Sequence, residues 1–197
     1  MNANQRLDKR ELILAKGAEV MTRRGYHGAG VQEIVQAAGV PKGSFYHYFA
    51  SKEEFALQAL QQVYGPRLQR YAQALENPAL SPRARILGYY GELVEHFARQ
   101  EKREYHCFIG SLSFEMAELS PILGAEIDAI LQRSADILQV CLERAQGAGE
   151  LAADEDCRSL ASFITSAWQG ALTRLKVANN TRALADFMQR LQLLLRA

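Results

Sequence analysis

Apolar residues recur at helical spacing through most of this 197-residue chain. From residue 53 onward they form windows with the pattern of amphipathic helices, and these windows are 53–64, 67–76, 83–99, 108–118, 122–146, 156–177 and 182–195. Beyond residue 55 no segment alternates apolar and polar residues as a half-buried strand does. The sequence therefore predicts an all-α fold.

Pairs of residues that favour turns separate these windows. The breaks fall at Gly65-Pro66, Asn77-Pro78, Ser81-Pro82, Ser120-Pro121, residues 147–149 and Asn179-Asn180. Because a proline can either end a helix or kink it, the sequence leaves open what happens to the helix at Gly65-Pro66.

The segment before residue 53 predicts shorter helices with clear ends. Apolar spacing over residues 13–21 indicates one helix that ends near Gly25. A second helix is predicted over 31–38, with Gly39 as its C-terminal stop. Pro41 suits the first turn of a third helix, and the SKEE segment that starts at residue 51 is typical of a capping box at the start of a fourth.

This order of elements indicates a three-helix bundle with a helix-turn-helix over about residues 30–49. Charge supports the interpretation, because residues 1–52 hold 8 lysines and arginines against 4 acidic residues, whereas residues 53–197 hold 15 against 18. Only the first part of the chain is suited to a polyanion. No apolar run is long enough to span a membrane, and the polar first residues do not resemble an export signal. A cytoplasmic protein without membrane attachment is expected.

The third predicted helix lies within VPKGSFYHYFASKEEF, residues 40–55, and has two unlike faces. At about 100° per residue, Phe45, Tyr48 and Phe49 share the inward face. The outward face is polar, aromatic and nearly free of acidic residues, and it contains Lys42, Gly43, Ser44, Tyr46 and His47. Such a face can contact base edges and phosphates in a DNA major groove. An exposed polar face that binds nothing is the alternative.

Residues 25–55, GYHGAGVQEIVQAAGVPKGSFYHYFASKEEF, closely resemble the DNA-binding motif of TetR-family transcriptional repressors. By position, the resemblance implies that Lys42, Gly43, Ser44, Tyr46 and His47 face the groove, that Tyr48 and Lys52 lie near phosphates, and that Gln32 contributes from the second helix. Gly30 departs from the family, which usually has serine or threonine at this position. A side-chain cap is therefore expected to be missing at the start of the second helix.

The resemblance also implies a division of labour along the chain. Residues 1–66 would form the DNA-binding domain, and residues 67–197 a larger helical domain for ligand sensing and dimerisation. The partners would be double-stranded operator DNA, a small-molecule or electrophile inducer and a second copy of the chain, with no cofactor and no metal. The apolar residues of the last two windows would form either the dimer interface or an intrachain core: Leu160, Ile164, Trp168, Leu172, Leu175, Leu184, Phe187, Met188, Leu191, Leu194 and Leu195.

Three cysteines are too few and too scattered for a disulfide framework or a zinc motif. Cys141 lies in an apolar window and is expected to pack in a core, while Cys157 follows three acidic residues that disfavour a thiolate. Cys107 differs, because it follows the basic stretch KREYH, residues 102–106, and precedes a predicted helix start. Cations and a helix N-terminus both favour a thiolate. An inert, partly buried thiol is the alternative.

Three segments, YHCFIGSLSFEMAELSP, PKGSFYHYF and SAWQGALTRLKV, look most like the electrophile-sensing, NemR-like branch of the TetR family. That resemblance implies that Cys107 reacts with quinones, reactive aldehydes or oxidants and that DNA is then released. It also implies that Lys176 occupies the position of a lysine that pairs with the cysteine. A lysine whose stem simply lies along an apolar stripe explains Lys176 equally well.

Two other functions compete with thiol sensing. The repressor could instead bind an apolar or acyl ligand reversibly, in a pocket lined by Phe97, Phe108, Phe114, Met116, Phe163 and Trp168, although all six could be core residues. Cys107 could also be the nucleophile of a hydrolase with His96 or His106 as base. Adjacent side chains on a helix diverge by about 100°, and no orienting Asn or Asp motif follows, so no enzyme is expected.

Overall fold

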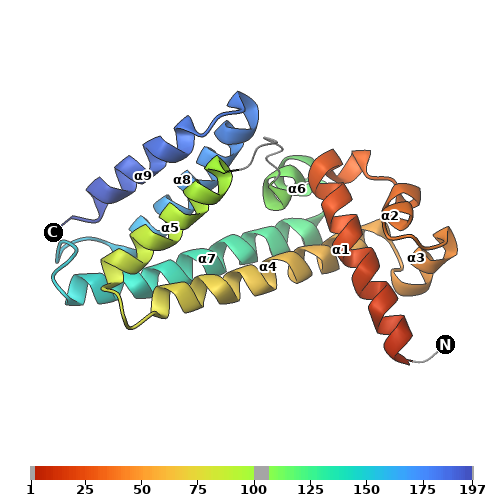
Figure 1. Ribbon diagram of the computed structural model, residues 1–197, viewed down its shortest axis with the longest axis horizontal. Coiled ribbons are helices and arrows are strands. Elements are labelled where there is room, and N and C mark those ends of the chain that lie inside the picture. The colour runs from red at the N-terminus through yellow and green to blue at the C-terminus, as the bar shows by residue number, and fades with distance from the viewer. Residues whose placement is uncertain (1–2, 100–106, 197) are drawn as a thin grey trace. The chain divides into compact units, whose positions relative to one another are not determined.

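The computed structural model describes residues 3–99 and 107–196, and within these ranges the chain forms nine helices and no strand (Figure 1). The all-α prediction is confirmed. The helices are α1 (Ala3–Gly28), α2 (Val31–Ala37), α3 (Lys42–Tyr48), α4 (Lys52–Glu76), α5 (Pro82–Ala98), α6 (Phe108–Met116), α7 (Pro121–Gly147), α8 (Cys157–Ala178) and α9 (Arg182–Leu194).

The chain divides into two compact units, and neither unit is a single stretch of sequence. The first contains α1, α2, α3, α4 as far as Pro66, α6, and α7 as far as Ala129. The second contains the remainder of α4 and α7 together with α5, α8 and α9. The DNA-binding motif predicted from the sequence lies entirely in the first unit.

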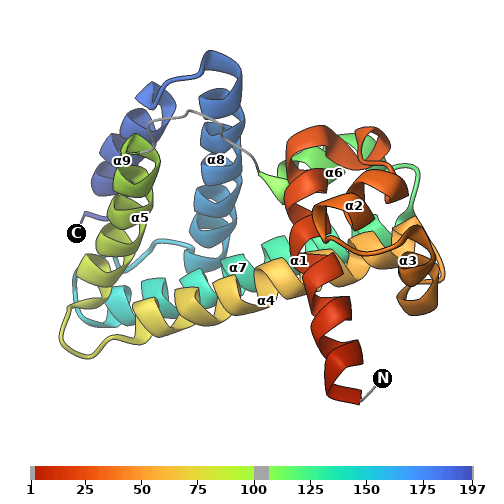
Figure 2. The same cartoon turned by 45° about the vertical axis from the view of Figure 1, so that its right-hand side comes forward.

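The first unit is built on α1, which contacts both α2 and α6 (Figure 2). Gly25 interrupts α1 with φ 77° and ψ 178°, close to the predicted end, and the chain then makes one more turn to Gly28. Between α3 and the start of α4, three phenylalanine rings pack against one another. Their centroids are 5.2 Å apart for Phe45 and Phe49, 5.4 Å for Phe45 and Phe55, and 5.1 Å for Phe49 and Phe55. This aromatic cluster holds α3 on the start of α4.

The fourth helix begins with a variant of the predicted capping box, in which the returning bond comes from Ala50 rather than from Ser51. Ser51 Oγ accepts a hydrogen bond from the backbone N–H of Glu54 at 3.0 Å, and the Glu54 carboxylate accepts one in return from the N–H of Ala50 at 2.7 Å. The helix then runs through Pro66 to Glu76. The windows 53–64 and 67–76 are therefore one helix, which decides the question left open at Gly65-Pro66.

The second unit has its own core, formed mainly by α5, α7, α8 and α9 (Figure 2). Tyr90, Trp168 and Phe187 lie at its centre, with ring centroids 5.1–5.3 Å apart. Most apolar residues of the last two predicted windows belong to this intrachain core rather than to an exposed interface: Leu160, Ile164, Trp168, Leu175, Leu184, Phe187, Leu191 and Leu195 are buried, and Leu172 and Met188 pack against them. Leu194, by contrast, is 38% exposed.

No helix in the described part of the chain is both long enough and apolar enough to cross a bilayer.

Candidate DNA-binding face and sensor thiol

The third helix is short and is defined at both ends by local signals. Pro41 is its N-cap, with φ −63° and ψ 149°, one residue before the first-turn position predicted for it, and its carbonyl accepts from the N–H of Ser44 at 2.9 Å. At the other end the N–H of Phe49 donates to the carbonyl of Phe45 at 2.9 Å. Gly39, with φ 65°, makes the turn from α2. The predicted stop after α2 is confirmed.

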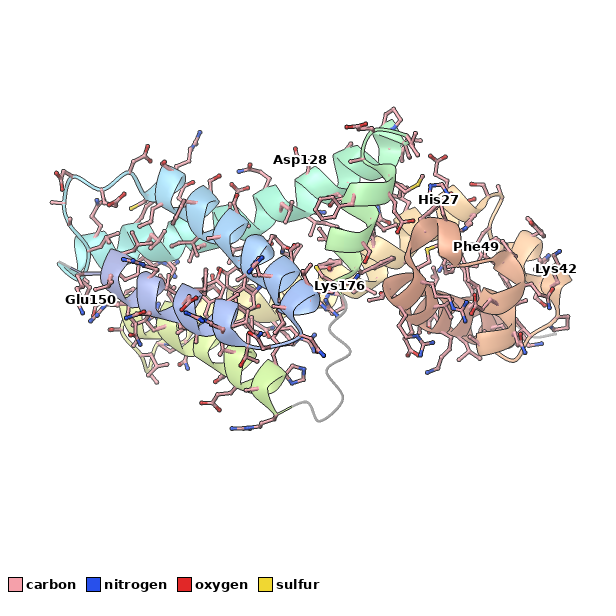
Figure 3. All side chains as sticks on the ribbon, turned by 90° about the horizontal axis from the view of Figure 1, so that it is seen from above. His27, Lys42, Phe49, Asp128, Glu150 and Lys176 are labelled. Atoms are coloured by element: carbon pink, nitrogen blue, oxygen red, sulfur yellow. The ribbon has the colours of Figure 1, made fainter. Side chains whose placement is uncertain are left out.

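The two faces of α3 differ as the helical spacing predicts. Phe45 is 0% and Phe49 1% exposed, whereas Tyr46 on the opposite face is 59% exposed. Among the remaining residues, Lys42, Gly43 and His47 are exposed, while Ser44 and Tyr48 are half-buried. Figure 3 shows Lys42 at the outer edge of this unit, whereas Phe49 lies within it. The helix therefore presents a cationic and aromatic surface held by a rigid apolar base.

The second helix adds Gln32, whose side chain is exposed. Its N-cap is Gly30, with φ −71° and ψ 147°, and no side chain caps the helix there. The expectation of a missing cap is confirmed. An ion pair from Arg24 Nε to Glu33 Oε1, at 2.7 Å, ties α1 to this helix.

Lys52 lies at the first position of α4, and its ammonium stands over the ring of Tyr26 at 4.5 Å from the centroid. Burial lowers the pKa of this ammonium, and the nearby Glu115 carboxylate opposes the effect. The pKa of Tyr26 is raised, first by burial and then by the charge of Glu53. Lys52 would have to give up part of this cation–π contact to reach a phosphate.

Cys107 is the N-cap of α6, so the predicted helix start after it is confirmed. Its Sγ accepts a hydrogen bond from the N–H of Gly110 at 3.4 Å, and the side chain is half-buried. The backbone N–H of Ile109, one residue before Gly110, donates a hydrogen bond to Tyr64 Oη on α4 at 3.1 Å. The stretch 102–106, whose basic residues are expected to favour a thiolate at Cys107, lies outside the described residues.

The other two thiols have surroundings that suppress the thiolate. Cys141 is 1% exposed, and burial raises its pKa. Cys157 is 6% exposed, and its pKa is raised by burial and then by acidic neighbours, among them Glu143 and Asp156. Both results agree with the sequence interpretation of Cys141 as a packing residue and Cys157 as a poor nucleophile.

The remaining predicted residues are distributed over both units. Lys176 is exposed on α8, in the second unit, whereas Cys107 belongs to the first. Of the six residues suggested for an apolar pocket, Phe97 and Trp168 are neighbours in the second unit, with ring centroids 6.4 Å apart. The others divide by burial: Phe108 and Met116 are buried in the first unit, while Phe114 is 82% and Phe163 57% exposed.

Sequence reasoning missed one contact in the first unit. The carboxylate of Glu115, on α6, accepts a hydrogen bond from the backbone N–H of His27 at 2.9 Å. A break near Gly25 can be predicted from the glycine itself, but the acceptor of the His27 N–H lies 88 residues after His27 in the chain. No local pattern connects the two. In the described part of the chain, no group of three or more histidine, cysteine or acidic residues could hold a metal ion.

Two family models match this chain. Residues 13–59 match the model described as bacterial regulatory proteins, tetR family, and residues 82–191 match the model described as tetracyclin repressor-like, C-terminal domain. The first match contains α2, α3 and the start of α4, and the second contains most of α5 to α9.

Individual relatives cover nearly the whole chain. The HTH-type transcriptional repressor DhaR of Mycobacterium sp. (strain GP1) is 34% identical over 91% of this chain and 88% of its own length. The HTH-type transcriptional repressor NemR of Escherichia coli (strain K12) is 31% identical over 94% of this chain and 93% of its own. The crystal structure of the reduced form of E. coli NemR matches with a TM-score of 0.87 at 30% identity, covering 94% of this chain and 96% of that one.

Proposed function

Because this chain belongs to the TetR family of transcriptional repressors, we propose that its α2 and α3 read a double-stranded operator through the exposed face of α3. The observation that carries the proposal is the pairing of that cationic and aromatic face with a buried phenylalanine base. Exposed side chains can contact base edges and phosphates without disturbing the apolar core, and a rigid base fixes the angle at which they enter the groove.

The proposed contacts follow from position on the helices. On α3, Lys42, Gly43, Ser44, Tyr46 and His47 face the groove. Gln32 contributes from α2, and Tyr48 and Lys52 lie toward phosphates. Gly43 has no neighbouring atom within 4 Å of the position of a Cβ, which suits close approach of the backbone to DNA.

Dimerisation would place two copies of α3 in successive major grooves, about 34–36 Å apart. Apolar side chains that the intrachain core does not use support an interface on α8 and α9: Phe163 is 57%, Val177 73%, Leu193 41% and Leu194 38% exposed. On this proposal the region 67–197 senses the inducer and dimerises, and the protein acts in the cytoplasm. A gel-filtration mass equal to one chain would exclude the dimer.

For the inducer we propose an electrophile that reacts with Cys107. The Cys107 thiol adds to a ring carbon of a quinone, and a carbon–sulfur bond forms. The thiol proton moves to one quinone oxygen and the hydrogen of the attacked ring carbon moves to the other, which gives a substituted hydroquinone with no leaving group. Support comes from the half-buried position of Cys107 at a helix start, the raised pKa of the other two thiols, and the relationship to the NemR repressor. Lys176 as a partner rests on the resemblance alone. A Lys176→Ala protein that responds to electrophiles like the parent would remove it.

Fluorescence anisotropy with the intergenic DNA upstream of the protein's own gene tests both parts of this function. Parent and Cys107→Ser proteins are titrated before and after treatment with benzoquinone. We expect specific binding by both proteins and loss of binding on treatment only in the parent. Equal loss in Cys107→Ser would exclude Cys107 as the sensor, and absence of specific binding would exclude the operator-reading surface.

A reversible ligand is the second candidate, and a feature of the second unit favours it. Thr165, on α8 one turn from Trp168, is 8% exposed, and its hydroxyl has no hydrogen-bond partner in the described structure. A buried hydroxyl without a partner is costly, and a polar group on an otherwise apolar ligand would satisfy it. Intact-protein mass spectra without an adduct on Cys107 under inducing conditions would favour this candidate.

A further inference from the structure

The corner between α1 and α2 begins with an unusual backbone conformation. Gly25 has φ 77° and ψ 178°, a region that is essentially restricted to glycine. The residue divides α1 into a long helix and a last turn, residues 26–28, from which the chain enters α2 at Val31. A break of this kind leaves the amide hydrogens of the next turn without helical acceptors.

Glu115 fills this break from α6. Its Oε2 accepts a hydrogen bond from the N–H of His27 at 2.9 Å. Its Oε1 lies only 1.9 Å from the position that a Cβ on Gly25 would occupy. The carboxylate therefore acts as the N-cap of the turn 26–28, and its charge is favourable at the positive end of a helical turn. Glycine is required at position 25 both for its backbone conformation and for the space that Glu115 occupies.

The corner has few other means of holding its direction. Gly30 gives α2 no side-chain cap, and the Arg24–Glu33 ion pair is largely exposed, with 62% and 32% of the two side chains accessible. Exposed ion pairs contribute little. The cap from Glu115 therefore joins the cation–π contact of Lys52 with Tyr26 as a restraint on the turn that leads into α2.

The other end of α6 is restrained as well. Cys107 Sγ accepts from Gly110 N–H at 3.4 Å, and Tyr64 Oη accepts from Ile109 N–H at 3.1 Å. Glu115 lies eight residues after Cys107, the N-cap of α6, so about 12 Å of helix separates the two at about 1.5 Å per residue. A Cβ on Gly110 would lie 3.4 Å from Sγ, an ordinary van der Waals contact. The anchored first turn helps to fix the position of Glu115 near the other end of α6.

We propose that Glu115 is a positioning residue for DNA binding: its carboxylate caps the turn 26–28 and thereby sets the direction in which the chain enters α2 and α3. The proposal rests on the operator-reading function proposed above. It assigns Glu115 no contact with DNA.

The test compares three variants of the full-length protein. Glu115→Ala removes the cap, Glu115→Gln keeps an oxygen that can accept from His27 N–H, and Glu118→Ala removes the same charge from an exposed position three residues away. Anisotropy with the upstream intergenic DNA should show about fivefold weaker specific binding for Glu115→Ala, the size expected for loss of a helix cap. Binding should be largely retained in Glu115→Gln and unchanged in Glu118→Ala.

A second measurement does not depend on DNA. Amide hydrogen exchange by NMR should show a protected His27 N–H in the parent and in Glu115→Gln, and faster exchange in Glu115→Ala while the amides of α4 stay protected.

The outcomes separate the two proposals. Absence of specific DNA binding by the parent would overturn the operator-reading function, and with it the role of Glu115 in DNA binding. Specific binding of equal strength by the parent and Glu115→Ala would overturn only the role of Glu115. Unchanged exchange at His27 in Glu115→Ala would overturn the cap itself.

Discussion

Three glycines near the DNA-binding helices show how differently one residue type can be used. Gly25 and Gly39 have φ of 77° and 65°, where a side chain is strained, whereas Gly30 has φ −71°, which any residue adopts readily. Neither Gly30 nor Gly39 has a neighbouring atom within 4 Å of its Cβ position. Both positions have space for a side chain, so the difference in backbone conformation decides whether a substitution at Gly30 or Gly39 is strained.

We predict that Gly30→Ser stabilises the protein by about 0.5–1 kcal/mol, because a hydroxyl caps α2 and the unfolded chain loses freedom. Gly39→Ser is the matched control, and the left-handed conformation should cost it about 1–2 kcal/mol. Urea unfolding followed by circular dichroism measures both. Equal effects at the two positions would contradict the argument from backbone conformation.

The three cysteines give a second prediction at this scale. Raised pKa values reduce the thiolate fraction of Cys141 and Cys157 at neutral pH, and both side chains are buried. Iodoacetamide at pH 7.5 should therefore alkylate Cys107 first, as read by peptide mass spectrometry, and the other two sites should react faster as the pH rises. A first adduct on Cys157 would show that burial does not control the order.

At the scale of single elements, different residues of α3 are expected to contribute to the stability of the fold and to the recognition of DNA. Phe45→Ala removes a fully buried ring from the aromatic cluster and should cost about 3–5 kcal/mol of unfolding free energy. Tyr46→Ala, at the next residue, removes a side chain that is 59% exposed. It should leave the unfolding free energy within about 0.5 kcal/mol of the parent and still weaken operator binding. Chemical unfolding and anisotropy on the same two proteins test this. A large loss of stability in Tyr46→Ala would contradict the assignment of faces.

Elements with local end signals could be predicted from the sequence. Gly25, Gly39 and the capping box at residue 51 fix helix ends through their own backbone and side-chain chemistry, and the structure has each of them. The path of α4 through Pro66 could not be predicted, because a helix survives a proline only where the surrounding packing stabilises both halves. The partition of α8 and α9 between core and exposed surface also depends on tertiary packing. The contact of Glu115 with the Gly25 corner joins distant segments, so no periodicity could show it.

At the scale of the whole molecule, stability depends on two buried phenols in the second unit. The hydroxyls of Tyr71 and Tyr90 share a hydrogen bond at 3.2 Å, and burial raises the pKa of both well above the usual range. A raised pKa means that the folded protein keeps these protons when the unfolded chain, titrating near pH 10, begins to lose them. Their contribution is therefore complete below about pH 10 and declines as the pH rises above it.

We predict that the unfolding free energy falls above about pH 10 with a steeper slope in the parent than in Tyr71→Phe, by up to about 1.4 kcal/mol per pH unit for each such tyrosine. Urea unfolding between pH 8 and pH 11 measures the slope. Tyr46→Phe, at an exposed position, is the control and should decline like the parent. Identical slopes for Tyr71→Phe and the parent would contradict the buried-phenol explanation.

The first unit draws on two separate stretches of sequence, because α6 and the beginning of α7 pack with α1 to α4. A hybrid regulator made by joining residues 1–66 of this chain to a foreign sensor would leave behind Phe108, Ile109 and Leu112, which are buried in this unit, together with Glu115. Such a graft would expose the side of α1 that α6 covers. A functional DNA-binding unit can therefore be exchanged between relatives in two ways. Either both of its segments are replaced, or the whole sequence as far as residue 129 is replaced.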